Sequence, residues 1–184
     1  MKSKTINFVL IMLAIIILFS FAVFKLYRLN EQTKAKIPYL TIGEHIDEFD
    51  LIGEDALEIN ASVFNSRRPA VIFIFSRPCN PCQKNIKYWR KMKEILKDRL
   101  DFYGIILDDA ASAFSFSEKA KLNFKLYVPV DLDRFIQKMR VKLNFSQTIL
   151  YSKNGVEYLK LGELEGDESV YIINMAKKMI RNLL

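Results

Sequence analysis

The chain has two cysteines, Cys79 and Cys82, with two residues between them. They end the segment Ser-Arg-Pro-Cys-Asn-Pro-Cys, which begins at Ser76 and follows an apolar run. At this spacing the second sulfur can attack the first and close a small ring. If a helix begins here, its unpaired N–H groups and its dipole favour an anion, so the first sulfur can lose its proton near neutral pH. The motif therefore predicts thiol–disulfide exchange.

Metal binding and an inert pair are the alternatives to redox exchange. A zinc site normally has four Cys or His ligands, and the chain has neither a second cysteine pair nor a suitable histidine. His45, the sole histidine, is expected to be a surface residue. A static disulfide between Cys79 and Cys82 would close too short a loop to stabilise the chain much. Redox exchange is the favoured interpretation, with no cofactor beyond the disulfide itself.

Predicted strands and helices alternate around the motif. The run Ala70–Phe75 predicts a strand buried on both faces, and apolar residues at helical spacing predict a helix from Cys79 to Leu96. Other expected strands cover residues 48–52, 56–59, 102–107, 126–130, 148–151 and 156–161, and other expected helices cover 112–122, 133–142 and 167–183. Helices between strands favour parallel pairing, whereas short turns at 53–55 and 152–155 favour antiparallel hairpins. The predicted fold class is α/β, with a mixed sheet flanked by helices on both faces.

The first 36 residues differ from the rest of the chain. No charged residue occurs from Thr5 to Phe24, and a helix of this length covers the ~30 Å hydrocarbon core of a bilayer. A cleaved signal peptide is the alternative, but the apolar run is long and does not end in small residues. The predicted organisation is an N-terminal transmembrane helix within a membrane anchor at 1–25, a tether at 26–36 and one globular domain at 37–184.

The net charge of +7 is concentrated near the predicted anchor. Residues 1–36 hold six of the 28 Lys and Arg residues and one of the 21 acids, which leaves 22 basic and 20 acidic residues in the body. Basic residues of the body alternate with acids along its helices, which indicates solvated faces. The positive residues suit an interface with anionic lipid, and the membrane, through residues 5–24, is an expected partner. No nucleic-acid partner is expected.

The orientation of the anchor depends on two opposing arguments. Two basic residues precede the span and four follow it up to Lys36, which slightly favours a cytoplasmic body. The cysteine chemistry favours the other side, because a tethered dithiol is useful where reducing power must be delivered through the membrane. We therefore expect a single-pass protein of the cytoplasmic membrane with its body on the extracytoplasmic (periplasmic) side.

The apolar strand, the motif at Cys79–Cys82 and the following helix resemble the thioredoxin superfamily. They are most similar to the membrane-tethered TlpA/ResA-type thiol-disulfide oxidoreductases, or redoxin domains. Residues 43–51 resemble the entry segment of those domains, and residues 147–155 resemble a late strand and turn, so that the resemblance spans about residues 40–182. It implies a thioredoxin-like fold, a reductase acting on disulfides of secreted proteins, and a membrane thiol reductant as partner.

The resemblance also implies roles for individual residues. Together with the helix electrostatics it makes Cys79 the nucleophile, while Cys82 resolves the mixed disulfide. Arg77 either stabilises the thiolate or is a solvated loop charge. The residues that shape the motif turn are Pro78, Asn80 and Pro81. The opposing docking edge, whose backbone would pair with a partner chain, is formed by Ser146, Gln147 and Thr148.

Several positions depart from the family pattern. Pro78 replaces an aromatic residue, Asn85 replaces a glutamate of many members, and Phe73 replaces the buried aspartate of thioredoxin itself. Gln147 replaces the family's cis-proline, and since a non-proline cis peptide costs ~3 kcal/mol, we expect Ser146–Gln147 to be trans. These departures leave a second hypothesis, a thioredoxin-fold partner-binding or assembly factor with little or no turnover. Peroxide reduction is disfavoured, because the motif does not supply a Thr-x-x-Cys pocket with its arginine.

Overall fold

The computed structural model describes residues 12–13, 15–28, 39–60, 62, 64, 68–141 and 145–182. The chain divides into two units, Met1–Pro38 and Tyr39–Leu184. In the first unit, residues 12–13 and 15–28 are helical. The predicted span at 5–24 lies only partly among the described residues, and the tether at 26–36 lies mostly outside them. No helix within the described parts of the chain is long and apolar enough to cross a membrane.

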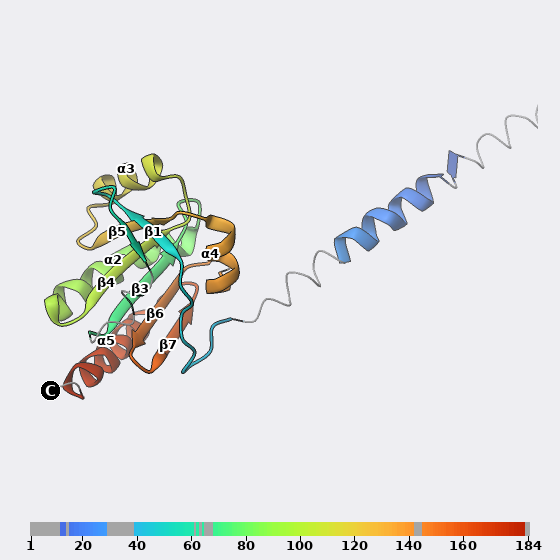
Figure 1. Ribbon diagram of the computed structural model, residues 1–184. Helices are drawn as coiled ribbons and strands as arrows, with labels where there is room; N and C mark the ends of the chain where they lie inside the picture. Colours follow the sequence, from blue (N-terminus) through green and yellow to red (C-terminus); the bar gives the residue numbers. More distant parts are fainter. Residues whose placement is uncertain are drawn as a thin grey trace, which may run out of the picture. The chain divides into compact units, whose positions relative to one another are not determined.

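The second unit is built on a mixed sheet, in which the described residues form seven strands in the order β2-β1-β5-β4-β3-β6-β7 (Figure 1). The strands are β1 Asp50–Gly53, β2 Glu58–Asn60, β3 Ala70–Phe75, β4 Asp101–Ile106, β5 Lys125–Pro129, β6 Gln147–Ser152 and β7 Gly155–Leu161. β3, β4 and β5 run parallel, and the other neighbouring pairs are antiparallel. The predicted mixed sheet and both predicted hairpins are therefore confirmed.

Residues 62 and 64 have 3-10 conformation, and four α-helices and a further short 3-10 helix accompany the sheet in the described part of this unit. They are α2 Asn80–Leu96, η2 Lys97–Arg99, α3 Ala110–Ala120, α4 Leu132–Met139 and α5 Gly166–Arg181. α3 begins before the predicted position because the Asp109 carboxylate caps it by accepting a hydrogen bond from the Ser112 N–H. α4 ends before the predicted position because Arg140 adopts a left-handed conformation, with φ 50° and ψ 45°.

The sheet separates two hydrophobic cores. Successive side chains of a strand point to opposite faces. Val71, Phe73 and Phe75 pack into a core with buried residues of α2, α3 and α5, whereas Ala70, Ile72 and Ile74 pack into a second core with residues of α4. Every residue of β3 is at most 1% exposed, which confirms the prediction of a strand buried on both faces. The predicted helices on both faces of the sheet are also confirmed.

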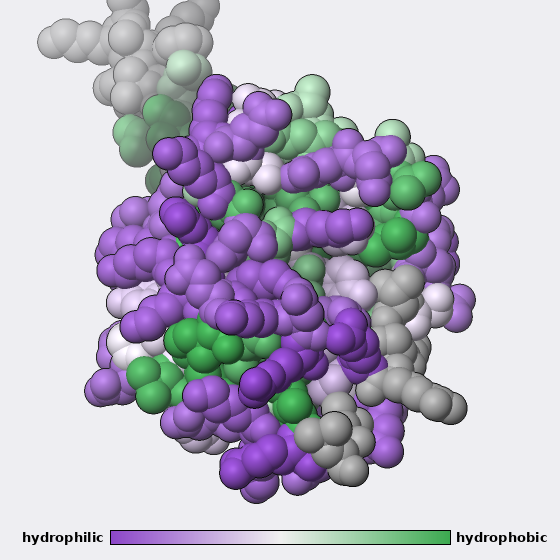
Figure 2. Space-filling model, turned by 90° about the vertical axis from the view of Figure 1, so that its left-hand side faces the viewer, coloured by the Kyte–Doolittle hydropathy of each residue, from purple (hydrophilic) through white to green (hydrophobic). Residues whose placement is uncertain are grey.

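α2 positions the cysteine motif against this sheet. Its buried side includes Trp89 and Met92, while Lys87 and Lys91 are exposed, so the predicted amphipathic helix is confirmed. Trp89 stacks on Phe73 of β3, with ring centroids 4.8 Å apart. The outer surface in Figure 2 is mostly hydrophilic, with hydrophobic side chains in small separate patches. The motif is therefore held by a helix that is anchored on its inner side.

The entry segment of the second unit joins the β6–β7 hairpin near its turn. The Gly43 N–H donates to the Val156 carbonyl at 2.7 Å, and the Val156 N–H donates to the Glu44 carbonyl at 2.9 Å. Gly155, at φ +93°, lies so close that a Cβ there would be 2.6 Å from the Glu44 carbonyl oxygen. Burial raises the pKa of the Glu44 carboxyl, but hydrogen bonds from Thr41 and charge pairing with Arg140 together lower it below its usual value. The first residues of the body are thus fixed to the hairpin turn.

Candidate active site

The two cysteines form a disulfide at the beginning of α2, with their Cα atoms 5.2 Å apart. Cys79 is the N-cap residue, and its sulfur accepts a hydrogen bond from the Cys82 N–H at 3.2 Å. Pro81 lies in the first turn, where its missing N–H leaves no donor unpaired. The sulfur of Cys79 therefore lies at the positive end of a 17-residue helix and receives one of its free N–H groups.

The two cysteines differ in their access to solvent. Cys79 is 5% exposed and Cys82 is 1% exposed. Both cysteines belong to the core that contains Trp89 and Phe75, but Pro78 and Asn80 beside Cys79 are exposed. Cys79 is therefore the slightly more exposed of two buried cysteines, and a visiting molecule would have to approach it closely. The second sulfur faces its partner cysteine from the interior side.

Arg77 pairs with a residue that the sequence analysis did not single out. Its guanidinium donates to the carboxylate of Asp108, which follows β4, and this hydrogen bond raises the pKa of Arg77. The loop is also held from α2, because the Gln83 side-chain amide donates to the Arg77 carbonyl at 3.0 Å. The predicted parallel pairing of β3 and β4 could have indicated this ion pair. Residues that follow two neighbouring parallel strands lie at the same end of the sheet.

The predicted docking edge begins β6 at the same end of the sheet as the motif. Gln147 is the register partner of Ile74, one residue before the end of β3. Ser146, Gln147 and Thr148 are all at most 1% exposed. The Thr148 hydroxyl accepts a hydrogen bond from the Trp89 indole N–H at 2.9 Å, so this side chain is engaged in packing. The Ser146–Gln147 peptide is trans, as expected.

Asn85 connects three parts of the site and is fully buried. Its side-chain NH₂ group donates to the Ser146 hydroxyl and to the Gly162 carbonyl, both at 2.8 Å. Its side-chain oxygen accepts from the Leu164 N–H at 2.7 Å. Asn85 therefore ties α2 to the start of β6 and to the segment after β7. The sequence analysis noted this residue only as a family departure, although a polar residue on the buried side of a helix is itself a signal for such a network.

The Gln147 side chain contrasts with that of Asn85. Its amide oxygen is buried and has no hydrogen-bond partner among the described residues. Within the same residues, no group of three or more His, Cys, Asp or Glu side chains could hold a metal ion. The redox-active groups of the described site are the two sulfurs of Cys79 and Cys82.

A disulfide that opens a helix directly after a fully buried strand of a mixed sheet defines a thioredoxin-like redox protein. The model of the AhpC/TSA family matches residues 42–149, and the chain belongs to this family. The resemblance drawn from the motif is thereby confirmed at the level of a redoxin domain with a Cys-x-x-Cys pair. No curated protein matches the chain in sequence.

Solved structures with the same fold come from thiol-disulfide oxidoreductases and from a peroxidoxin. The thioredoxin domain of a Bacteroides vulgatus thiol-disulfide oxidoreductase has a TM-score of 0.62 and 19% identity, covering 77% of this chain and 99% of that one. A thiol:disulfide interchange protein from a Bacteroides species has a TM-score of 0.63 and 18% identity, covering 77% and 91%. Peroxidoxin BcpB from Mycobacterium tuberculosis has a TM-score of 0.62 and 18% identity, covering 77% and 99%. At these identities the similarity establishes the thioredoxin-like fold.

Proposed function

We propose that this protein is a membrane-anchored extracytoplasmic thiol-disulfide oxidoreductase that reduces disulfides of secreted proteins. The observation that carries the proposal is the position of the Cys79 sulfur, which lies at the N-terminus of α2 and accepts the Cys82 N–H. After reduction, the same N–H and the helix dipole stabilise a thiolate at this atom. Cys79 is also the more exposed cysteine, which makes it the nucleophile of the pair.

The reaction transfers two electrons from the reduced pair to the substrate. The Cys79 thiolate attacks one sulfur of the substrate disulfide, which breaks that bond and releases the other substrate sulfur as a thiolate. The buried Cys82 sulfur, after losing its proton, then attacks Cys79 in the mixed disulfide. This step releases the second substrate thiolate and forms the Cys79–Cys82 disulfide. A dithiol reductant, proposed to be a membrane protein, must return two electrons and two protons for the next cycle.

The first test is reduction of insulin by the chain in the presence of dithiothreitol. We expect Cys79→Ser to lower the rate to that of dithiothreitol alone, because the nucleophilic sulfur of the pair is lost. Cys82→Ser should also fail to turn over, but it should accumulate a mixed disulfide with its substrate. Unchanged insulin reduction by Cys79→Ser would refute the proposal. Consumption of hydrogen peroxide without insulin reduction would instead assign a peroxidase.

A second candidate is a partner-binding or assembly factor with little or no turnover. It is favoured by Asn85, which stands at the position of the family glutamate and uses its amide in three structural hydrogen bonds. No carboxylate is supplied at that position to carry a proton for Cys82. This candidate predicts partner capture that does not depend on a mixed disulfide, so Cys82→Ser would trap none.

The redox direction is tested by the reduction potential of the Cys79–Cys82 couple. A reductase predicts a value near the thioredoxin potential of about −270 mV, whereas an oxidase predicts a value near the DsbA potential of about −120 mV. The measurement requires only equilibration with glutathione or dithiothreitol buffers and a count of free thiols. It is therefore independent of the identity of the substrate.

The membrane anchor and its orientation are part of the same proposal. They are supported by the uncharged run at 5–24 and by the exposed apolar side chains in the described helical residues, including Leu18 at 70% and Phe19 at 72% exposure. A helix with apolar residues on all sides suits lipid. We expect the full chain to sediment with membranes and to be digested by protease added outside spheroplasts. Protection of the body until the membrane is permeabilised would place it in the cytoplasm instead.

A further inference from the structure

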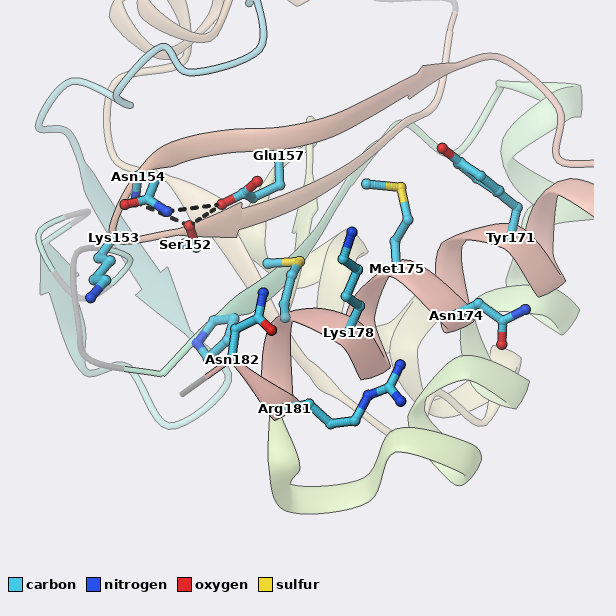
Figure 3. A pocket seen from close by; sticks show the side chains of 12 residues that line it. Ser152, Lys153, Asn154, Glu157, Tyr171, Asn174, Met175, Lys178, Arg181 and Asn182 are labelled. Carbon is cyan, nitrogen blue, oxygen red and sulfur yellow. Dashed lines mark hydrogen bonds between the residues drawn. The ribbon is translucent and has the colours of Figure 1, made fainter. Parts of the chain in front are cut away.

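A cavity of about 600 Å³ lies between the β6–β7 hairpin and the second half of α5 (Figure 3). We call it the α5 pocket. Pro69, just before β3, and Ser152, the last residue of β6, both line it. The cysteine motif follows the other end of β3, so the α5 pocket lies at the opposite end of the sheet from the disulfide. The proposed redox reaction assigns no role to this pocket.

The inner surface of the α5 pocket is apolar. Met175 and Met179 line it and pack against the hydrophobic core. The Tyr171 side chain, which is 55% exposed, also lines the pocket, and its ring lies 5.7 Å from that of Tyr158. Methionine side chains are flexible and polarisable, so they adapt to apolar groups of different shape. This part of the pocket is suited to a small hydrocarbon or aromatic group.

The charged residues around the pocket are mostly cations. Lys153 is on the hairpin, and Lys178 and Arg181 are on α5 (Figure 3). None of the three takes part in an ion pair within the described residues. The single carboxylate of the lining is Glu157. The site therefore has an excess of positive charge.

The carboxylate of Glu157 is directed to the hairpin turn. It accepts a hydrogen bond from the Ser152 hydroxyl at 2.6 Å and another from the Asn154 side-chain amide at 3.5 Å. Both donors are neutral groups. The Glu157 carboxylate is thus held by the hairpin turn and forms no ion pair with a cation among the described residues. Asn174 and Asn182, which also line the pocket, add side-chain amides that can donate hydrogen bonds to an anion.

We propose that the α5 pocket binds a small amphiphilic anion, in which a carboxylate or phosphate group is attached to an apolar group. The anionic group pairs with Lys178 and its cationic neighbours, and the apolar group contacts the two methionines. The volume lies within the range of about 300–1,000 Å³ for small-molecule sites. A simple inorganic anion would leave the methionine surface uncovered, and a neutral apolar molecule would leave the cations unpaired.

The experiment uses the full chain with ¹³C-labelled methionine methyl groups, in nanodiscs of zwitterionic lipid. Benzoate is the probe, because it combines a carboxylate with a small ring. Benzamide, benzylamine and acetate are the matched controls for charge, sign of charge and the apolar part. We expect saturable shifts of the Met175 and Met179 methyl signals with benzoate, and at least tenfold weaker binding of each control compound. Equal binding of benzamide or benzylamine would overturn the proposal.

Two variants on the same turn of α5 locate the site. Lys178 lines the pocket, whereas its neighbour Lys177 is exposed and does not. We expect Lys178→Gln to weaken benzoate binding at least fivefold and Lys177→Gln to leave it unchanged. An equal loss in both variants would indicate diffuse attraction to a basic surface and would refute the site. The readout does not involve the cysteines, so its result is independent of the proposed redox function.

A last arm separates a dissolved anion from a lipid headgroup. The same methyl signals are recorded after zwitterionic nanodiscs are exchanged for nanodiscs that contain phosphatidylglycerol. No further shift is expected, because the pocket takes the whole small molecule. Shifts with phosphatidylglycerol and none with benzoate would reject the small-ligand site and assign contact with an anionic membrane surface.

Discussion

Asn85 and Gln147 are two buried amides at the redox end of the sheet, and their surroundings differ. Asn85 is on α2 and uses both its NH₂ group and its oxygen in three hydrogen bonds between 2.7 and 2.8 Å. Gln147 begins β6, and its side-chain oxygen has no partner among the described residues. Both positions depart from the family pattern that the motif resembles, the first from a glutamate and the second from a cis-proline.

The difference in hydrogen bonding indicates that the Asn85 side chain stabilises the fold, whereas the oxygen of the Gln147 side chain does not. A buried, unpaired acceptor costs about 1–3 kcal/mol, whereas a satisfied buried amide stabilises the parts that it joins. At Asn85 an acid has been replaced by a residue that fastens the start of β6. At Gln147 the side chain adds no bond through its oxygen. We therefore expect stability to depend strongly on Asn85 and weakly on Gln147.

The largest effect is expected for Asn85→Ala. The Leu164 N–H and the Ser146 hydroxyl each lose a buried partner, and a small cavity remains in the site. The free energy of unfolding of the oxidised protein, measured by urea denaturation, should fall by about 3 kcal/mol. Lys91→Ala, at an exposed position of the same helix, is the control and should change it by less than about 0.5 kcal/mol. Similar values for the two variants would contradict a joining role of Asn85.

An intermediate effect is expected for Thr148→Val, next to Gln147 along β6. Valine keeps the shape of threonine but removes the oxygen that accepts the Trp89 indole N–H. Leaving that buried donor unpaired should cost about 1–2 kcal/mol of unfolding free energy in urea. Thr148→Ser keeps the hydroxyl and separates loss of the bond from loss of the methyl group. If Thr148→Val lowers the unfolding free energy no more than Thr148→Ser does, the hydrogen bond is not what holds Trp89.

The smallest effect is expected for Gln147→Met. The two side chains are similar in length, and the change removes an acceptor that has no partner. The unfolding free energy should not fall and should rise by up to about 1 kcal/mol, the low end of the cost of an unpaired acceptor, in contrast to the loss expected for Asn85→Ala. A loss as large as that of Asn85→Ala would show that the amide of Gln147 is structurally engaged after all, and the comparison would fail.

Local patterns in the sequence predicted most of the fold. The apolar run of β3, the spacing along α2 and the glycine-containing turns each depend on neighbouring residues, and each prediction was correct. The ends of elements were less certain, because the end of α4 depends on one left-handed residue, Arg140, that no periodicity reveals. The mixture of parallel and antiparallel pairs followed from the alternation of strands and helices together with the hairpins, whereas the strand order, with β1 beside β5, was not predicted.

The site was predicted only where its residues are close in sequence. Cys79, Cys82 and the start of α2 follow from a short motif. The partners of Asn85 lie 61 to 79 positions away, and Asp108 lies 31 positions after Arg77. Such pairs depend on which strands and loops meet in space, so a single sequence does not identify them. The docking role of Ser146, Gln147 and Thr148 stays a prediction, and the structure adds that their side chains are buried.

The attachment of the entry segment has a mechanical consequence. Force applied along the chain from the N-terminal side meets the hydrogen bond from Arg140 to the Tyr39 carbonyl and the buried Leu40 side chain, and then the two backbone bonds between Gly43, Glu44 and Val156. These two backbone bonds are the first attachment to the hairpin. They hold the turn end of the β6–β7 hairpin, whereas Cys79 follows the other end of the sheet. Tension on the entry segment would therefore act on the hairpin-turn end of the sheet, away from the end that carries the sulfur pair.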